Sequence, residues 1–181
     1  MIRIVIAEDQ EMLLGVIGSL LNLEEDMEVV GHASNGEEAI SLVHRLQPDV
    51  CMMDIEMPKM SGLDAAEALI STNSKVIILT TFARSGYTER ARKAGVRGYL
   101  LKDSPSEELA CSIRSIMDGN LIYSSELLDY DTSENEGENE GLEPSLDCSR
   151  TDENSNPPSK SIGPVRNYFS TIFDKMKLPT G

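Results

Sequence analysis

The pattern of apolar and polar positions divides the chain into parts, and the first part alternates between two kinds of segment. Short runs rich in valine and isoleucine are apolar at successive positions, as expected of strands covered on both faces of a parallel sheet. These runs predict five strands, at Ile2–Ala7, Glu28–Ala33, Val50–Asp54, Val76–Thr80 and Gly98–Leu101.

A segment with helical spacing of its apolar residues follows each predicted strand. In the first of these segments, Leu13, Ile17 and Leu20 recur on one face, and Gly95 and Gly119 are placed to end the fourth and fifth. The predicted helices span Met12–Leu23, Glu37–Arg45, Gly62–Ile70, Gly86–Ala94 and Ser106–Met117. This regular alternation predicts an α/β domain with a doubly wound, five-stranded parallel sheet.

Charged and hydroxyl side chains stand at the carboxyl ends of four predicted strands. Glu8 and Asp9 follow the first strand, Asp54 and Thr80 close the third and fourth, and Lys102 follows the fifth. One acid after a strand is usually a helix cap, and one lysine is usually solvated. Ligands of doubly wound sheets bind at this edge, so the conjunction predicts a functional site.

Carboxylates beside an ammonium and a hydroxyl suit the transfer of a phosphoryl group. Asp54 is placed as the nucleophile, Lys102 as a positive partner for a phosphoryl oxygen, and Thr80 as a hydroxyl donor. A carboxylate reacts with phosphorus only when charge on the phosphoryl group is neutralised, which Mg²⁺ does, and Mg²⁺ prefers oxygen ligands. The candidate Mg²⁺ ligands are Glu8, Asp9, Asp54 and the backbone carbonyl of Glu56.

The composition adds a strong and uneven acidic bias. The formal net charge is −15, and residues 130–156 hold nine acids and one base, Arg150, a net charge of −8. Such a block repels nucleic acid. The three cysteines have no paired spacing, no signal peptide precedes the first strand, and no apolar run has membrane-spanning length. We therefore expect a cytoplasmic protein without membrane attachment.

Two segments follow the α/β domain, which we assign to residues 1–125. Residues 126–163 are rich in serine, glutamate, asparagine and proline and poor in apolar anchors, which predicts a disordered acidic linker. Residues 164–178 regain helical periodicity, with an apolar face and a proline at the first turn, which predicts one short amphipathic helix.

Four stretches around the strand ends resemble the receiver domain of two-component response regulators, in particular the NarL/FixJ (LuxR-type) subfamily. The stretches are Ile-Ala-Glu-Asp-Gln, Met-Asp-Ile-Glu-Met-Pro, Ile-Leu-Thr-Thr-Phe-Ala and Gly-Tyr-Leu-Leu-Lys-Asp. The resemblance covers residues 1–125 and implies the flavodoxin-like receiver fold. It also implies that Asp54 accepts phosphate from the histidine of a sensor kinase, and that Asp9 is a more direct Mg²⁺ ligand than Glu8.

Further implications of the resemblance concern the response to phosphorylation. Thr80 and Lys102 look like the residues that read the phosphoryl group, Tyr99 matches an aromatic switch, and Phe82 lies beside the site. Relatives form homodimers through the first and fifth helices, which implies the same for this chain. The resemblance implies no enzyme activity beyond the chain's own phosphorylation and dephosphorylation.

The resemblance is weakest after the receiver. Relatives carry a helix-turn-helix domain that binds promoter DNA, and residues 161–178 resemble its recognition helix. Residues 142–160 contain adjacent prolines and no apolar stripe, so the two preceding helices are not predicted, and the last helix is not expected. The output domain is therefore interpreted as degenerate, which argues against autonomous DNA binding. The implied DNA contacts are Arg166, Asn167 and Lys175.

Two functions of different classes stay open at this point. The chain is either a response regulator that binds DNA and regulates transcription, or a receiver that acts by protein contact alone, as a phosphate sink or dimerisation partner. A dehalogenase-type enzyme is disfavoured, because that chemistry calls for a second aspartate two residues after Asp54, where Glu56 stands.

Overall fold

A computed structural model of the chain describes residues 1–81, 86–102 and 106–124. Several predictions lie outside these ranges. They are the linker at 126–163, the helix at 164–178, the switch-site residue Phe82, and the DNA contacts Arg166, Asn167 and Lys175.

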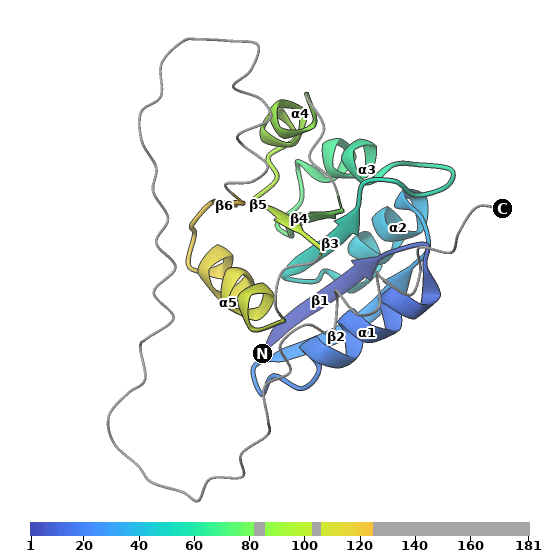
Figure 1. Cartoon of the computed structure of the whole chain (residues 1–181). Helices are drawn as coiled ribbons and strands as arrows, with labels where there is room; N and C mark the ends of the chain where they lie inside the picture. The colour runs from blue at the N-terminus through green and yellow to red at the C-terminus, as the bar shows by residue number, and fades with distance from the viewer. Residues whose placement is uncertain (82–85, 103–105, 125–181) are drawn as a thin grey trace, which may run out of the picture.

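The centre of the fold is a parallel sheet with strand order β2-β1-β3-β4-β5-β6 (Figure 1). The five predicted strands are confirmed, two of them one residue longer than expected. A sixth strand of two residues pairs with β5 at the sheet edge, and it is too short to produce a periodic pattern. The strands are β1 (Ile2–Ala7), β2 (Met27–Ala33), β3 (Val50–Asp54), β4 (Lys75–Thr80), β5 (Gly98–Leu101) and β6 (Ile122–Tyr123).

Five helices connect the strands and cover both faces of the sheet. Side chains of α1 and α5 pack on one face, and those of α2, α3 and α4 pack on the other (Figure 1). Asn35 and Ser61 cap α2 and α3 by accepting hydrogen bonds from the backbone N–H groups of Glu38 and Asp64. None of the helices in the described ranges is long and apolar enough to cross a bilayer. The helices are α1 (Glu11–Leu21), α2 (Gly36–Leu46), α3 (Gly62–Leu69), α4 (Tyr87–Lys93) and α5 (Ser106–Met117).

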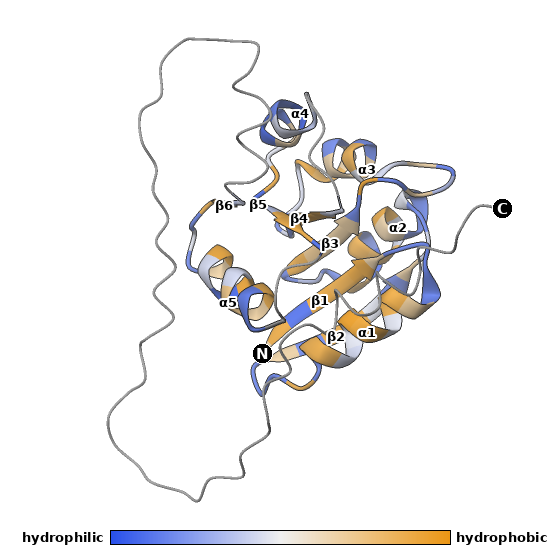
Figure 2. Cartoon of the chain, viewed as in Figure 1, coloured by the Kyte–Doolittle hydropathy of each residue, from blue (hydrophilic) through white to orange (hydrophobic). Residues whose placement is uncertain are grey.

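The central strands divide their side chains between two hydrophobic cores, one on each face of the sheet. In β1, Ile4 and Ile6 join the core under α1 and α5, whereas Val5 and Ala7 join the core under α2, α3 and α4. The strands and the inward faces of the helices are accordingly the apolar parts of the ribbon in Figure 2. Burial on both faces explains why the strands are continuous apolar runs in the sequence.

Strand β2 forms one edge of the sheet and is irregular. The register between β1 and β2 shifts between Ile4 and Val5, as at a β-bulge. The backbone N–H of Val29 donates to the side-chain oxygen of Asn22 at 2.9 Å, and Glu28 and His32 are exposed along the strand. A side chain therefore satisfies one of the backbone donors of this edge strand.

Candidate functional site

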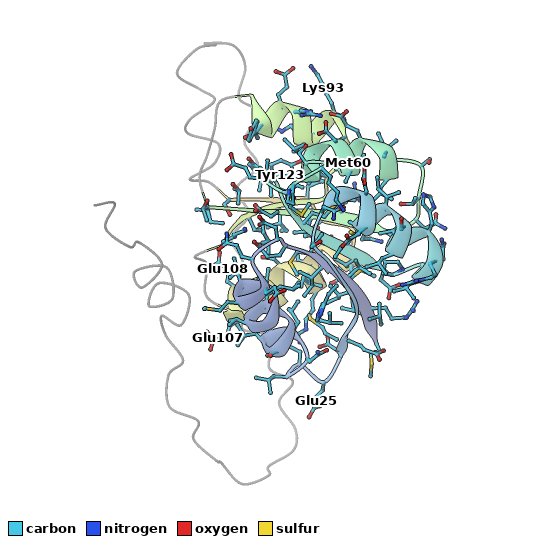
Figure 3. The ribbon with its side chains drawn as sticks, turned by 90° about the vertical axis from the view of Figure 1, so that its right-hand side faces the viewer. Glu25, Met60, Lys93, Glu107, Glu108 and Tyr123 are labelled. Atoms are coloured by element: carbon cyan, nitrogen blue, oxygen red, sulfur yellow. The ribbon has the colours of Figure 1, made fainter. Side chains whose placement is uncertain are left out.

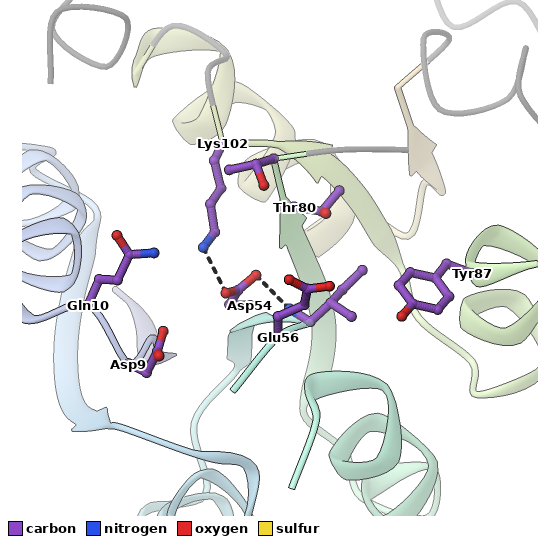
Figure 4. Close-up of a pocket in the computed structure, with 9 residues that line it drawn as sticks. Asp9, Gln10, Asp54, Glu56, Thr80, Tyr87 and Lys102 are labelled. Atoms are coloured by element: carbon purple, nitrogen blue, oxygen red, sulfur yellow. Dashed lines mark hydrogen bonds and ion pairs between the residues drawn. The ribbon is translucent and has the colours of Figure 1, made fainter. Parts of the chain in front are cut away.

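A pocket of about 270 Å³ opens at the carboxyl edge of the sheet, above the end of β3 (Figure 4). Its walls come from the last residues of β3 and β4, from the segments that follow β1, β3, β4 and β5, and from the first residue of α4. The residues that line it are Asp9, Gln10, Asp54, Ile55, Glu56, Thr80, Thr81, Tyr87 and Lys102.

The strand order explains why the polar residues predicted from the sequence converge here. Strand β3 lies between β1 and β4, and β5 pairs with β4 on its other side. In these pairings Ala7 is level with Met53, Asp54 with Leu79, and Thr80 with Leu101. The residues that follow each strand therefore emerge together around Asp54, as the sequence predicts.

Lys102 joins two carboxylates at the base of the pocket. Its Nζ lies 2.6 Å from Oε2 of Glu8 and 3.0 Å from Oδ2 of Asp54, and the Lys102 and Glu8 side chains are almost fully buried. Burial raises the pKa of Glu8 above its ordinary value, and the Lys102 ammonium opposes that shift only in part. A third carboxylate, that of Asp9, lies close to those of Glu8 and Asp54. The Lys102 ammonium offsets part of the negative charge of this group.

A hydrogen bond from the neighbouring backbone fixes the orientation of the Asp54 carboxyl group. Its Oδ1 accepts a hydrogen bond from the backbone N–H of Ile55 at 2.7 Å, which leaves Oδ2 on the side of Lys102. Helix α3 begins directly against this backbone: the N–H of Gly62 donates to the carbonyl of Ile55 at 3.0 Å. A Cβ at Gly62 would clash with the carbonyl oxygen of Asp54. Close packing of α3 thus fixes where Asp54 stands.

The acidic residues fit a small, hard cation. Glu8, Asp9 and Asp54 each offer a carboxylate oxygen, and these oxygens all lie within 4.8 Å of one another. An all-oxygen donor set matches the preference of Mg²⁺, and the burial of Glu8 and Asp54 favours a counter-ion. Glu56 lines the same pocket, and its carbonyl stays a candidate ligand.

The aromatic residue with a predicted switching role points into the protein. Tyr99 on β5 is fully buried, with its ring centroid 5.9 Å from that of Tyr123 on β6. The Tyr123 hydroxyl donates to the backbone carbonyl of Val96 at 2.9 Å, which fixes this second ring. Tyr99 belongs to β5, and Lys102 directly follows the last residue of that strand, so three positions separate the ring from the ammonium along the chain. Its switching role stays a prediction.

Four residues that line the pocket are absent from the predicted site: Gln10, Ile55, Thr81 and Tyr87. Ile55 and Thr81 directly follow the predicted residues Asp54 and Thr80. Gln10 directly follows the acidic pair at the end of β1, so its position could have been suggested by its neighbours. Tyr87 starts α4, and its apolar body packs against the core under α2, α3 and α4. No strand-end pattern marks Tyr87, because it is the first residue of α4 and does not follow a strand directly.

Comparison with known proteins gives consistent similarities. Residues 4–114 match the family model described as the response regulator receiver domain. The chain is 57% identical to the transcriptional regulatory protein DesR of Bacillus subtilis, over 98% of this chain and 92% of that protein. It is 51% identical to the uncharacterized transcriptional regulatory protein YvfU of the same organism, over 97% of this chain and 91% of that protein.

Solved structures show the same likeness. A DNA-binding response regulator of the LuxR family from Staphylococcus aureus superposes with a TM-score of 0.62 at 39% identity. The match covers 65% of this chain and 99% of that chain.

Proposed function

Because this chain belongs to the response regulator receiver family, we propose that it accepts a phosphoryl group on Asp54 from a sensor histidine kinase. The observation that carries this proposal is the buried Lys102 ammonium, which contacts both Glu8 and Asp54 at the edge of the pocket. A lysine that only stabilised the fold would not require the solvent-open pocket that lies beside Lys102. A phosphoryl group on Asp54 would give this ammonium a further anionic partner besides Glu8 and Asp54.

The transfer can be written with the groups of the pocket. A carboxylate oxygen of Asp54 bonds to phosphorus while the bond from phosphorus to the donor breaks, and the electron pair leaves with the donor. Lys102 pairs with a phosphoryl oxygen, and Thr80, at the end of β4, is placed to donate its hydroxyl to another. Mg²⁺ held by Asp9, Asp54 and Glu8 would neutralise charge on the phosphoryl oxygens.

Metal-dependent phosphate uptake tests this function. Incubated with Mg²⁺ and acetyl phosphate, the full chain is expected to gain the mass of one phosphoryl group, and acid should release it. Excess EDTA should prevent the gain, because three carboxylates and a phosphoryl group would then repel one another without a cation. Equal uptake with and without EDTA would count against the proposal.

For the output of the signal, regulation of transcription is the better-supported proposal. The relatives DesR and YvfU are both named as transcriptional regulatory proteins, and the similarity to each extends over nearly the whole chain, past the receiver. The alternative, a receiver that acts by protein contact alone, is favoured by the acidic block at residues 130–156 and the prolines after it. A degenerate output domain belongs to that alternative.

Pairing of two copies through α1 and α5 would connect phosphorylation to either output. Three exposed apolar residues lie on or after these helices: Met12 is on α1, Leu23 follows α1, and Leu121 follows α5. Arg114 on α5 contacts Glu24 and Asp26 in the loop after α1, which fixes the two elements relative to each other. We propose this combined face as the homodimer surface.

A gel shift separates the two outputs. In a gel shift with promoter-bearing DNA fragments, the phosphorylated full chain is expected to bind more DNA than the unphosphorylated chain, and added salt should weaken the binding steeply. Light scattering of the same samples should show a larger fraction of dimer after phosphorylation. Dimer formation without any DNA binding would favour the protein-contact function.

A further inference from the structure

An ion-pair bridge joins α3 to α4 on the surface next to the pocket. The Nε of Arg90 on α4 lies 2.6 Å from Oε1 of Glu67 on α3, and an Nη of the same guanidinium bonds to Asp64, one turn earlier on α3. Asp64 is also bonded to Ser61, the residue that caps α3. Asp64 and Glu67 of α3 therefore bind two different nitrogens of the Arg90 guanidinium on α4.

This bridge connects Asp54 indirectly to Tyr87, through α3 and α4. Helix α3 begins in backbone contact with Asp54 at Gly62, and α3 holds Arg90 of α4. One turn before Arg90, the first residue of α4 is Tyr87, which lines the pocket above Asp54. The position of α4 against α3 therefore determines where the Tyr87 ring stands relative to Asp54.

The Tyr87 ring stands on the opposite side of Asp54 from Asp9 and Gln10 (Figure 4). The Tyr87 side chain is half-buried, packs against the core under α2, α3 and α4, and also lines the pocket. Ile55 and Glu56, which also line the pocket, come from the loop after β3. Tyr87 is the one aromatic ring among the lining residues, so it is the largest rigid barrier that the described residues place there.

We propose that Tyr87 limits the access of water to a phosphoryl group on Asp54, and that Arg90 acts as a positioning residue that holds Tyr87 in place. The inference rests on the proposed phosphorylation of Asp54. In the reaction concerned, a water oxygen bonds to phosphorus, the bond from phosphorus to the Asp54 oxygen breaks, and the electron pair returns to the carboxylate. The water proton leaves with the inorganic phosphate or the solvent. A ring along one side of the open pocket would reduce the directions from which water can reach phosphorus, and excluding water suppresses such hydrolysis.

The lifetime of the phosphorylated full chain tests the inference. After removal of acetyl phosphate in the presence of Mg²⁺, Tyr87→Ala is expected to lose phosphate roughly threefold to tenfold faster than the unmodified chain. Tyr87→Phe should keep most of the protection if the ring is the barrier. Arg90→Ala and the milder Glu67→Gln should each accelerate loss in the same direction.

A matched control comes from the same helix. Lys93 on α4 pairs with Glu89 at 2.6 Å, and in Figure 3 its side chain points away from the molecule. Lys93→Ala removes an exposed ion pair from α4 without touching α3 or the pocket, so its phosphate lifetime should match that of the unmodified chain. An equal acceleration in Lys93→Ala would mean that any weakening of α4 suffices and would overturn the role given to Arg90.

A double substitution separates positioning from general stability. If Arg90 acts through Tyr87, Arg90→Ala should add little to the rate already reached by Tyr87→Ala. Multiplied effects in the double variant would overturn the positioning role, as would phosphate lifetimes that do not change in the single variants. If no variant takes up phosphate at all, the proposed function itself fails, which mass analysis before the decay would reveal.

Discussion

Replacing Asp54 with asparagine is expected to abolish phosphate uptake. The substitution keeps the size of the side chain but removes the anionic oxygen that would attack phosphorus, because an amide is not a comparable nucleophile. The Oδ1 position can still accept the hydrogen bond from Ile55, so the local fold should survive. After incubation with acetyl phosphate and Mg²⁺, intact-mass analysis of Asp54→Asn should show only the unmodified mass.

The control for this experiment is another aspartate in the same domain. Asp118 is exposed just after α5 and lies outside the pocket. Asp118→Asn removes one negative charge, as Asp54→Asn does, yet its phosphate uptake should equal that of the unmodified chain. Uptake that persists in Asp54→Asn would move the phosphorylation site to another residue.

Replacing Gly62 with alanine is expected to have the largest effect on stability. The added Cβ would collide with the carbonyl oxygen of Asp54, a backbone atom that cannot move aside as a flexible side chain can. Forcing extra atoms into such a contact costs about 3 kcal/mol of unfolding free energy, and more if α3 is displaced. Because Asp54 itself would shift, the rate of phosphate uptake should also fall roughly tenfold to a hundredfold.

Gly15→Ala offers a matched control in a different helix. Gly15 is exposed on α1, and a Cβ there would meet nothing within 4 Å. The same substitution should therefore stabilise the protein by about 0.5–1 kcal/mol, because alanine favours the helix over glycine. Urea unfolding of both variants gives the comparison. A Gly62→Ala variant as stable as Gly15→Ala would contradict the tight packing of α3 on Asp54.

The strands and the acidic cluster were predictable from the sequence for a physical reason. A parallel strand covered on both faces must be apolar along its length, so the bounds of β1, β3 and β5 could be read from where the apolar runs stop. Glutamate and lysine are rarely buried, so Glu8 and Lys102 stand out in the sequence directly after two apolar strands. Their burial in one ion-paired cluster follows from strand order, and right-handed crossovers restrict that order strongly.

Contacts between helices were beyond the reach of the sequence. Arg90 pairs with acids 23 and 26 residues away, and on a helical pattern all three positions resemble ordinary solvated charges. The sequence likewise places Tyr87 in the predicted helix Gly86–Ala94 but does not indicate that its side chain lines the pocket. Strand β6 was missed because two residues give no measurable alternation, and its partner β5 supplies the hydrogen bonds that define it. Such features depend on distances between elements, which periodicity within one element does not encode.

The irregular edge strand β2 bears on how this protein behaves at high concentration. An open sheet edge is a template on which strands of other molecules can add, which is the first step of ordered aggregation. Here the amide of Val29 is already bonded to Asn22, and the bulge interrupts the regular spacing of the edge. The exposed Glu28 adds a charge that a second copy would also carry. These features of β2 disfavour the addition of a strand from another molecule at this edge of the sheet.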